Sequence, residues 1–448
     1  MSLEEENQQH RAELKPDTLV DRYRVKKLIG AGGFGNIYSV YDTENNDKLY
    51  AMKIIEESKL INSPSNDNSQ KTESKSKKKE KKTFYDIAFE NPDFIENEIL
   101  YSLKDNNEIY FPNICAEGKF ELDPSNNDSE NDDQTSNTKI KFLYIIMTLF
   151  GPSLGLLKLV VPKKRFSSFT STKIAIDMLN CIQVFHDKGY VHNDIKPGNF
   201  LIHANSQSPA VLIDFGLSIK YLKETANVQS ENSKGHNTQL NHIKFEKDLG
   251  FTGTIKYASI NAHYGYLLSR RDDLYSWFYS VFELAAGDVP WGEELDFDYS
   301  LKMKKNISKY IDEAVKLDYL PPEFKLVYKY ITSLSFEETP NYSAIRGTLR
   351  KALRRIAGSK NNDDNLYASK KYDWEMVSKT AMNTISDVPT DIPKPAFSYS
   401  PYCYPNNNNV DDNTDNNNNN SNVPINNEDE GDLNDVTTEG GCHGCILI

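Results

Sequence analysis

The stretch YVHNDIKPGNFLI, residues 190–202, brings together three side chains whose chemistry suits phosphoryl transfer. The carboxylate of Asp194 can orient an attacking hydroxyl or accept its proton. The ammonium of Lys196 can neutralise a phosphate as charge shifts in the transition state. The amide oxygen of Asn199 is a hard ligand suited to Mg²⁺. The pattern HxDxKxxN therefore indicates transfer of a phosphoryl group to a hydroxyl.

Two further charged residues interrupt apolar stretches. Asp214, in VLIDFGLS, could chelate a metal that bridges phosphates, or it could cap a turn. Lys53, in YAMK, stands inside an apolar strand, which is unfavourable unless its ammonium meets an anion. FIENEILYSL offers the carboxylate partner, and Glu96 is favoured because it shares a helical face with Leu100, with Glu98 as the alternative. Two glutamates on a helix surface would be the plainer interpretation.

A glycine-rich segment, GAGGFG, contributes Gly30, Gly32 and Gly35 between two predicted strands. Such glycines let the backbone fold closely over phosphates, although a simple hairpin turn has the same composition. A strand follows them where dinucleotide binding needs a helix, so a flap over ATP fits better. The glycine loop, Lys53, HxDxKxxN and DFG occur in this order, and together they disfavour the turn-cap interpretation of Asp214.

The elements that must position these residues differ along the chain. Residues 23–30, 35–42 and 48–55 are short, β-branched or aromatic, and separated by turn residues, which predicts strands. Residues 173–189 and 272–287 have apolar positions at helical spacing and end on glycine. Strands first and helices afterwards predict an α+β fold, with a small sheet lobe, a helical lobe and a cleft.

Composition limits the remaining possibilities. The net charge of the 448 residues is −13, and residues 377–448 hold eleven acidic residues against two lysines, so nothing favours nucleic-acid binding. Five cysteines form neither a zinc pattern nor a disulfide framework. The polar N-terminus and the lack of an apolar run of about 18 residues predict an intracellular chain without a transmembrane helix.

We expect three parts in the chain: a polar leader at 1–21, a folded domain at 22–375, and a disordered acidic, Asn-rich tail at 376–448. Polar inserts interrupt the domain at 61–83, 121–139 and 222–247. Each insert is predicted to be a long loop, because it holds too little apolar surface to offset its ordering entropy.

The span 22–375 resembles the protein-kinase catalytic domain. Several stretches resemble the casein kinase I group, namely LFGPSL at 149–154, HNDIKPGNFL, GTIKYASINAH at 253–263 and SRRDDLYSW at 269–277. SIN at 259–261 stands where most protein kinases carry Ala-Pro-Glu. GFTGT, FYSVFELAAGDVPW, PPEF and YDWE are similar to the tau-tubulin kinase branch. The resemblance implies a bilobal fold, with a small antiparallel sheet lobe and a larger helical lobe, and a serine/threonine protein kinase that uses ATP and Mg²⁺.

The resemblance also implies roles for particular residues. Asp194 and Lys196 would be catalytic, with Lys53 and Glu96 positioning the phosphates and Asn199 and Asp214 holding metal. Thr254 would contact Asp194, and Asp273 would hydrogen-bond the backbone of the catalytic loop. The ATP-binding residues would be Ile29, Gly30, Gly32, Gly33, Gly35, Ile37, Ala51, Lys53, Met147 and Leu149, with Met147 as gatekeeper and Leu149 as the hinge residue whose backbone meets adenine.

Position 193 departs from the usual pattern. Kinases with Arg before the catalytic Asp use it to grip a phosphate on the activation segment, and Asn193 cannot do so. We therefore expect activity without phosphorylation of residues 217–252, where Ser218, Tyr221 and Thr225 lie.

The group's preference for acidic or phosphorylated sites predicts acidic protein substrates, and Lys256 stands where the group has a basic residue. The acidic GEELDFDYS after Trp291 departs from the group and puts recognition of phosphorylated sites in question.

The chain closes on GCHGCILI. Cys445 with the three aliphatic residues that follow fits a prenylation motif, and Cys442 is the expected palmitoylation site; a chance cysteine in the tail is the alternative. The lysine-rich run 75–82 could attract lipid, act as a nuclear signal or simply be solvated. These features predict a monomer on the cytoplasmic face of a membrane, with the nucleus less favoured.

Two other functions compete with an active protein kinase. A catalytically weak kinase-fold scaffold would recruit partners through the inserts and tail, but the complete set of ligands argues against it. A small-molecule kinase is disfavoured by the SIN segment and the helix after it.

Overall fold

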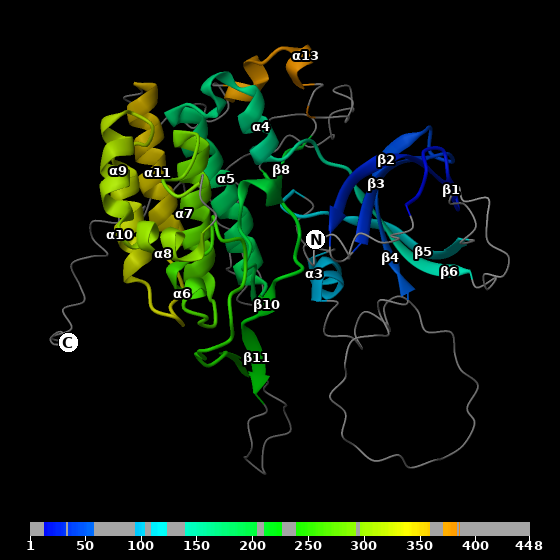
Figure 1. The fold of residues 1–448 in the computed structure, drawn as a ribbon, viewed down its shortest axis with the longest axis horizontal. Coiled ribbons are helices and arrows are strands. Elements are labelled where there is room, and N and C mark those ends of the chain that lie inside the picture. Colours follow the sequence, from blue (N-terminus) through cyan, green and yellow to red (C-terminus); the bar gives the residue numbers. More distant parts are fainter. Residues whose placement is uncertain are drawn as a thin grey trace, which may run out of the picture. The chain divides into compact units, whose positions relative to one another are not determined.

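The structure is a computed structural model that describes residues 13–32, 35–57, 95–103, 109–122, 139–203, 210–225, 239–292, 296–358, 371–382 and 385 (Figure 1). The chain divides into two compact units. The sheet unit comprises Met1–Gly151 and Val211–Lys220, and the helical unit comprises Pro152–Ala210 and Tyr221–Ile448.

The sheet unit is built on a six-stranded antiparallel sheet in the order β1-β2-β3-β4-β6-β5. Its strands are β1 Leu19–Val20, β2 Tyr23–Gly32, β3 Gly35–Asp42, β4 Lys48–Glu56, β5 Ile114–Leu122 and β6 Ile140–Thr148. The three strands predicted from short β-branched or aromatic stretches between turn residues are thus confirmed as β2, β3 and β4. The unit also contains helix α3 Ile95–Leu103 and the short strands β9 Val211–Leu212 and β10 Ile219–Lys220.

The two faces of this sheet differ in character because side chains alternate along each strand. One face carries a buried apolar cluster that includes Tyr38, Met52 and Ile146, and Leu14 from the preceding segment covers it. The backbone N–H of Leu14 donates to the hydroxyl of Tyr38 at 3.0 Å, which fixes this cover. The opposite face holds the alternate positions, among them Lys53.

The helical unit is centred on α5 Ser168–Asp187, which is buried along most of its length and packs against α7 Arg270–Ala286 and α11 Tyr342–Ala357. Both predicted helices are confirmed, and Gly287 ends α7 with φ 98° as its C-cap. The remaining helices are α4 Leu154–Val160, α6 Ile260–His263, α8 Phe297–Lys305, α9 Ile307–Lys316, α10 Glu323–Ser333 and α13 Lys379–Met382, with 3-10 turns η4 Pro162–Lys164, η5 Pro197–Asn199 and η6 Asp373–Met376. The short strands are β7 Tyr190–Val191, β8 Phe200–Leu201, β11 Leu222–Thr225 and β12 Gln239–His242.

The insert predicted at 222–247 is not a simple loop. Its ends form the antiparallel pair β11 and β12, in which Leu222 pairs with His242. The ring of His242 lies against Tyr221 and Phe336, with centroids 5.2 and 5.0 Å away, and this aromatic packing supplies the stabilisation that the polar sequence lacks. The insert at 61–83, most of 121–139, and the tail beyond residue 385 lie outside the described residues.

None of the helices in the described ranges is long and apolar enough to cross a membrane.

Candidate active site

Strand register places several predicted ATP-binding residues on one face of the sheet. Lys53 pairs with Ile37 on β3, and Ile37 pairs in turn with Gly30 on β2. Ala51, two residues before Lys53, pairs with Met147 on β6. Residues two apart on a strand share a face, so these five residues line one surface from β2 to β6.

Of the other predicted ATP-binding residues, Ile29 is exposed on β2, and Leu149 is half-buried directly after β6. Gly32 pairs with Gly35 across the turn, and Gly33 lies outside the described residues.

The glycines of the loop differ in what the fold demands of them. A Cβ on Gly35 would lie 2.1 Å from the carbonyl oxygen of Ile54, and Gly35 has φ 136°, so the fold requires glycine there. A Cβ on Gly30 would meet only ordinary contacts, 3.7 Å from Ile37. The packing of the strands therefore does not require glycine at position 30.

Lys53 is 5% exposed at the centre of the sheet. Helix α3 carries Glu96 on the same stripe as the buried residues Ile99, Leu100 and Leu103, as the helical period predicts. The side chain of Glu96 lies outside the described residues, so the Lys53–Glu96 pair stays a prediction.

Asp214 follows β9 in the sheet unit and is exposed. The backbone N–H of Leu212 donates to the carbonyl of Tyr110 at 2.9 Å, and the buried ring of Phe215 lies edge-on to Phe111 at 6.2 Å. Asp214 itself has φ 67°, a left-handed conformation that Asp adopts more readily than most residues. Buried neighbours on both sides thus hold its exposed carboxylate in place.

In the helical unit, Asp194 and Lys196 form a compact polar group with Thr254. Lys196 Nζ donates to Asp194 Oδ2 at 2.5 Å, and Thr254 Oγ1 donates to Asp194 Oδ1 at 2.7 Å. Lys196 Nζ also lies 3.2 Å from Thr254 Oγ1. Asp194 is 7% exposed, whereas the Lys196 side chain is 27% exposed. Each carboxylate oxygen has one protein donor and keeps capacity for another hydrogen bond.

Asn199 is fixed to the same loop. Its Nδ2 donates to the carbonyl oxygen of Asp194 at 2.9 Å, so its amide oxygen is the atom that could ligate a cation. In the described part of the chain, no cluster of three His, Cys, Asp or Glu residues could hold a metal on its own. Asn199 in the helical unit and Asp214 in the sheet unit each offer an oxygen of the kind that Mg²⁺ prefers, and their joint role as metal ligands stays a prediction.

Asp273, on α7, holds the backbone of the loop that precedes Asp194. Its Oδ2 accepts from the backbone N–H of His192 at 2.7 Å, and its Oδ1 accepts from that of Asn193 at 2.9 Å. His186 Nε2 also lies 2.9 Å from Oδ2, and Asp273 is 1% exposed. The two residues before Asp194 are thus held by one buried carboxylate, which is the contact expected from the resemblance.

Asn193 adopts a backbone conformation that favours its residue type. Its φ is 67°, in the left-handed region where Asn is several-fold enriched over most residues. The carbonyl oxygen of Asn193 would lie 2.7 Å from a Cβ on Gly253, so the two backbones approach closely. Asn at this position therefore has a conformational reason, and the expectation that no phosphate on residues 217–252 is needed stays a prediction.

Two of the three hydroxyl residues considered in 217–252 are buried. Ser218 and Tyr221 are each 3% exposed, and the Tyr221 hydroxyl donates to the carbonyl of His186 at 2.8 Å. Arg270 donates to the same hydroxyl at 3.2 Å. The side chain of Thr225 lies outside the described residues. A kinase could reach Ser218 or Tyr221 only after local opening.

Lys256 is engaged by carboxylates of α7 and the turn after it. Its Nζ lies 2.6 Å from Asp288 Oδ1 and 3.2 Å from Glu283 Oε1, while Lys158 Nζ lies 2.5 Å from the same Glu283 oxygen. Burial alone would lower the pKa of Lys256, but Asp288 and Glu283 raise it above its usual value. Two cations and two carboxylates balance here, so Lys256 is not a lone positive charge.

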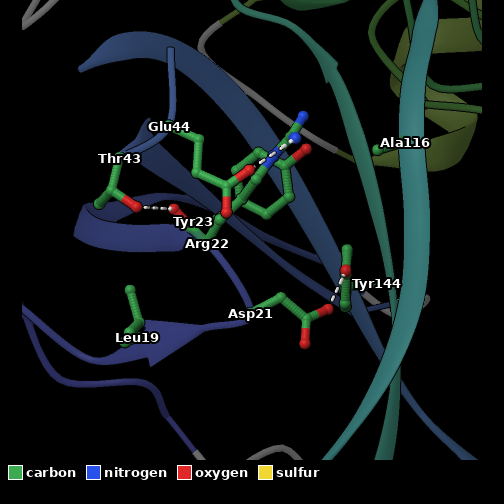
Figure 2. A pocket seen from close by; sticks show the side chains of 8 residues that line it. All are labelled: Leu19, Asp21, Arg22, Tyr23, Thr43, Glu44, Ala116 and Tyr144. Carbon is green, nitrogen blue, oxygen red and sulfur yellow. Dashed lines mark hydrogen bonds and ion pairs between the residues drawn. The ribbon is translucent and has the colours of Figure 1, made fainter. Parts of the chain in front are cut away.

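A cavity of about 620 Å³ in the sheet unit is lined by Leu19, Asp21, Arg22, Tyr23, Thr43, Glu44, Ala116 and Tyr144 (Figure 2). The hydroxyl of Tyr144 donates to Asp21 across it. Tyr23 and Tyr144 belong to the apolar cluster, so the cavity opens on the face opposite Lys53 and contains none of the predicted site residues.

Sequence reasoning missed the side chains that support the end of the activation segment. Ser259 Oγ and Asn261 Nδ2 of the SIN segment both donate to Asp272 Oδ1, at 2.7 and 2.8 Å. Lys304 donates to backbone carbonyls nearby. The acidic pair in SRRDDLYSW was the available signal for Asp272, whereas helical spacing was the only feature that separated Lys304 from its lysine neighbours.

Part of this chain is similar in sequence to known proteins. Residues 132–335 match the family described as the protein kinase domain. The sheet-rich unit and the helical unit, each taken by itself, agree with the α+β protein-kinase fold to which that family belongs. The chain is also 33% identical over 235 residues to a probable serine/threonine-protein kinase of Dictyostelium discoideum, across 52% of this chain and 42% of that protein. The match spans less than half of that relative.

Proposed function

We propose that this chain is a serine/threonine protein kinase of the casein kinase I type, which transfers the γ-phosphoryl group of ATP to hydroxyls of acidic protein substrates. The observation that carries the proposal is the arrangement around Asp194: a buried carboxylate, bonded by Thr254 and Lys196, in a loop that Asp273 anchors.

In the proposed reaction, the substrate hydroxyl donates a hydrogen bond to the Asp194 carboxylate, which orients its oxygen toward the γ-phosphorus. The oxygen forms a bond to phosphorus as the bond to the β-phosphate oxygen breaks and ADP departs. The hydroxyl proton passes to Asp194. Lys196, which is more exposed than Asp194, reaches the transferring phosphoryl oxygens and offsets their charge.

The sheet face supports the nucleotide in this proposal. Gly30, where the fold itself would accept a Cβ, leaves room for a phosphate to approach the backbone. Lys53 supplies a positive charge to the α- and β-phosphates, with Glu96 as its partner. Asn199 and Asp214 would hold Mg²⁺, which when bound neutralises phosphate charge.

Acidic substrate sites are supported by Lys256, whose raised pKa keeps it cationic. Asp288, half-exposed at 46%, offsets part of that charge, so we propose a moderate preference for acidic residues and no dependence on phosphorylated ones.

Membrane association is a separate proposal that rests on the CILI sequence at 445–448 alone, which lies outside the described residues. Geranylgeranylation of Cys445, with palmitoylation of Cys442 as the second signal, would hold the protein at a cytoplasmic membrane face. The monomeric state likewise stays a prediction.

Phosphate transfer from ATP and Mg²⁺ to casein, followed by phosphoamino-acid analysis, tests the proposed activity. We expect phosphoserine or phosphothreonine with the wild type and with Asp312→Asn, a matched control at an exposed carboxylate on α9. We expect loss of transfer with Asp194→Asn. Equal transfer by Asp194→Asn, or phosphotyrosine as the main product, would overturn the proposal.

A further inference from the structure

Lys304, on α8, is a fully buried lysine of the helical unit. Its Nζ donates to the carbonyl oxygens of Ile255 at 2.5 Å and Ala258 at 2.7 Å. It also lies 3.1 Å from Nε2 of the buried His263. An ammonium has three donors, and these three acceptors match them.

Burial of this ammonium is unfavourable for the fold. Among its contacts in the described ranges are carbonyl dipoles, an imidazole, and the rings of Tyr279 and Trp291 with centroids 5.5 and 5.4 Å away. Burial lowers the pKa of Lys304 to about 7, which reflects the absence of a compensating carboxylate in these surroundings. A methionine would fill the same space without this desolvation, but it could not hold the two carbonyls.

The carbonyls that Lys304 holds belong to the turn that begins at Thr254. The backbone N–H groups of Tyr257 and Ala258 both donate to the carbonyl of Thr254, at 2.9 Å. The side chain of Thr254 in turn donates to Asp194 and accepts from Lys196. Hydrogen bonds, joined through the short backbone of this turn, therefore connect α8 to the proposed catalytic carboxylate.

A second side chain also donates to a backbone carbonyl of this turn. Trp291 Nε1 donates to the carbonyl of Lys256 at 2.8 Å, between the two carbonyls that Lys304 holds. The Trp291 side chain is 1% exposed. Lys304 contributes two of these three backbone anchors, while the side chains of Lys256 and Tyr257 bond Glu283, so removal of Lys304 loosens the turn at Ile255 and Ala258.

We propose that Lys304 is a positioning residue for phosphoryl transfer: it fixes the turn 254–258 so that Thr254 holds Asp194 and Lys196 in their reactive arrangement. This inference rests on the proposed kinase function. Lys304 should act on the transfer step and leave ATP binding unchanged, because its hydrogen bonds within the described ranges go to the turn and to His263, all in the helical unit.

Kinetics of Lys304→Met test the inference, with the exposed Lys302→Met on the same helix as the matched control. We expect kcat for a serine peptide to fall by about tenfold or more, as for loss of a positioning contact, while KM for ATP stays within about twofold. In a Thr254→Val background, Lys304→Met should lower kcat by less than about twofold further, because both act through one contact. Lys304→Gln, which keeps a donor, should be intermediate.

Hydrogen exchange gives a readout that does not need activity. The amides of Tyr257 and Ala258 should exchange faster in Lys304→Met than in Lys302→Met, because their turn has lost its anchors. The inference is wrong if Lys304→Met matches Lys302→Met in both kcat and exchange rates. It is also wrong if Lys304→Met lowers kcat by the same factor in the Thr254→Val background as in the wild type. A wild type that binds ATP but transfers nothing would overturn the proposed function, while the exchange rates would still decide the anchoring of the turn.

Discussion

Asp273→Asn is a severe test of how the catalytic loop is held, because one buried carboxylate serves three donors. Oδ2 accepts from the backbone of His192 and from His186, and Oδ1 accepts from the backbone of Asn193. An amide has one oxygen. If that oxygen takes the place of Oδ2, the new NH₂ group faces the N–H of Asn193 and two donors oppose each other.

The magnitude follows from these contacts. A buried donor without its acceptor costs about 1–3 kcal/mol, and each of the two remaining bonds loses about 1 kcal/mol as its acceptor becomes neutral. Relief of carboxylate desolvation offsets part of this loss. We expect Asp273→Asn to lower the free energy of unfolding by about 2–4 kcal/mol, and kcat by about tenfold or more because Asp194 is the next residue after this anchored pair.

Denaturant unfolding and steady-state kinetics measure both effects, with Asp312→Asn as control. Asp312 is 65% exposed and pairs with Lys325, so its substitution should change stability by less than about 0.5 kcal/mol. If Asp273→Asn unfolded at the same denaturant concentration as the control and kept the wild-type kcat, the reasoning about the loop would be refuted.

Other perturbations follow from the same contacts. Asn193→Arg should lower the free energy of unfolding by about 1 kcal/mol, because Arg is less tolerant of a left-handed φ. Its kcat should stay within about threefold of the wild type. Strong activation of this variant on phosphorylation would contradict that expectation. Asp288→Asn should lower KM for an acidic peptide relative to a neutral one, because Lys256 loses its nearest carboxylate; an unchanged ratio of the two KM values would argue against a role in selection. Burial raises the pKa of Asp177 to about 6. The protonated Asp177 therefore stabilises the fold below about pH 4, and this contribution to the free energy of unfolding is lost as the pH rises through 6. Asp177→Asn should therefore flatten the fall in unfolding free energy across that range by up to about 3 kcal/mol, which urea titrations at each pH would measure. Cys445→Ser should move the protein out of the membrane fraction if Ile448 is the mature C-terminus; an unchanged fraction would exclude prenyl anchoring.

The sheet could be predicted because its signal is local. Short β-branched or aromatic runs between turn residues predicted β2, β3 and β4, and the resemblance named Ala51 and Lys53, which the structure places two residues apart on β4. The contacts of Thr254 and Asp273 with the catalytic loop were accessible only through the resemblance, since they join residues 60 and 80 positions apart.

The anchor at Lys304 could not be predicted, because its partners are backbone carbonyls, which leave no mark in the sequence. The run LKMKKN offers three lysines, and only the helical spacing with the buried residues Ser300 and Ile307 distinguishes Lys304. The pairing of β11 with β12 was missed for a related reason. Those strands are mostly polar, and the packing comes from the contacts of His242, on β12, with Tyr221 and Phe336 outside the strands.

ATP binding and phosphate transfer, measured on one preparation of wild type and Asp194→Asn, test the central claim most directly. The account predicts that both proteins bind ATP with Mg²⁺ at similar Kd, because the proposed nucleotide face lies in the sheet unit, and that only the wild type phosphorylates serine or threonine. Transfer by Asp194→Asn at the wild-type rate would contradict the role of Asp194. ATP binding without transfer by the wild type would contradict the kinase function itself and favour a scaffold.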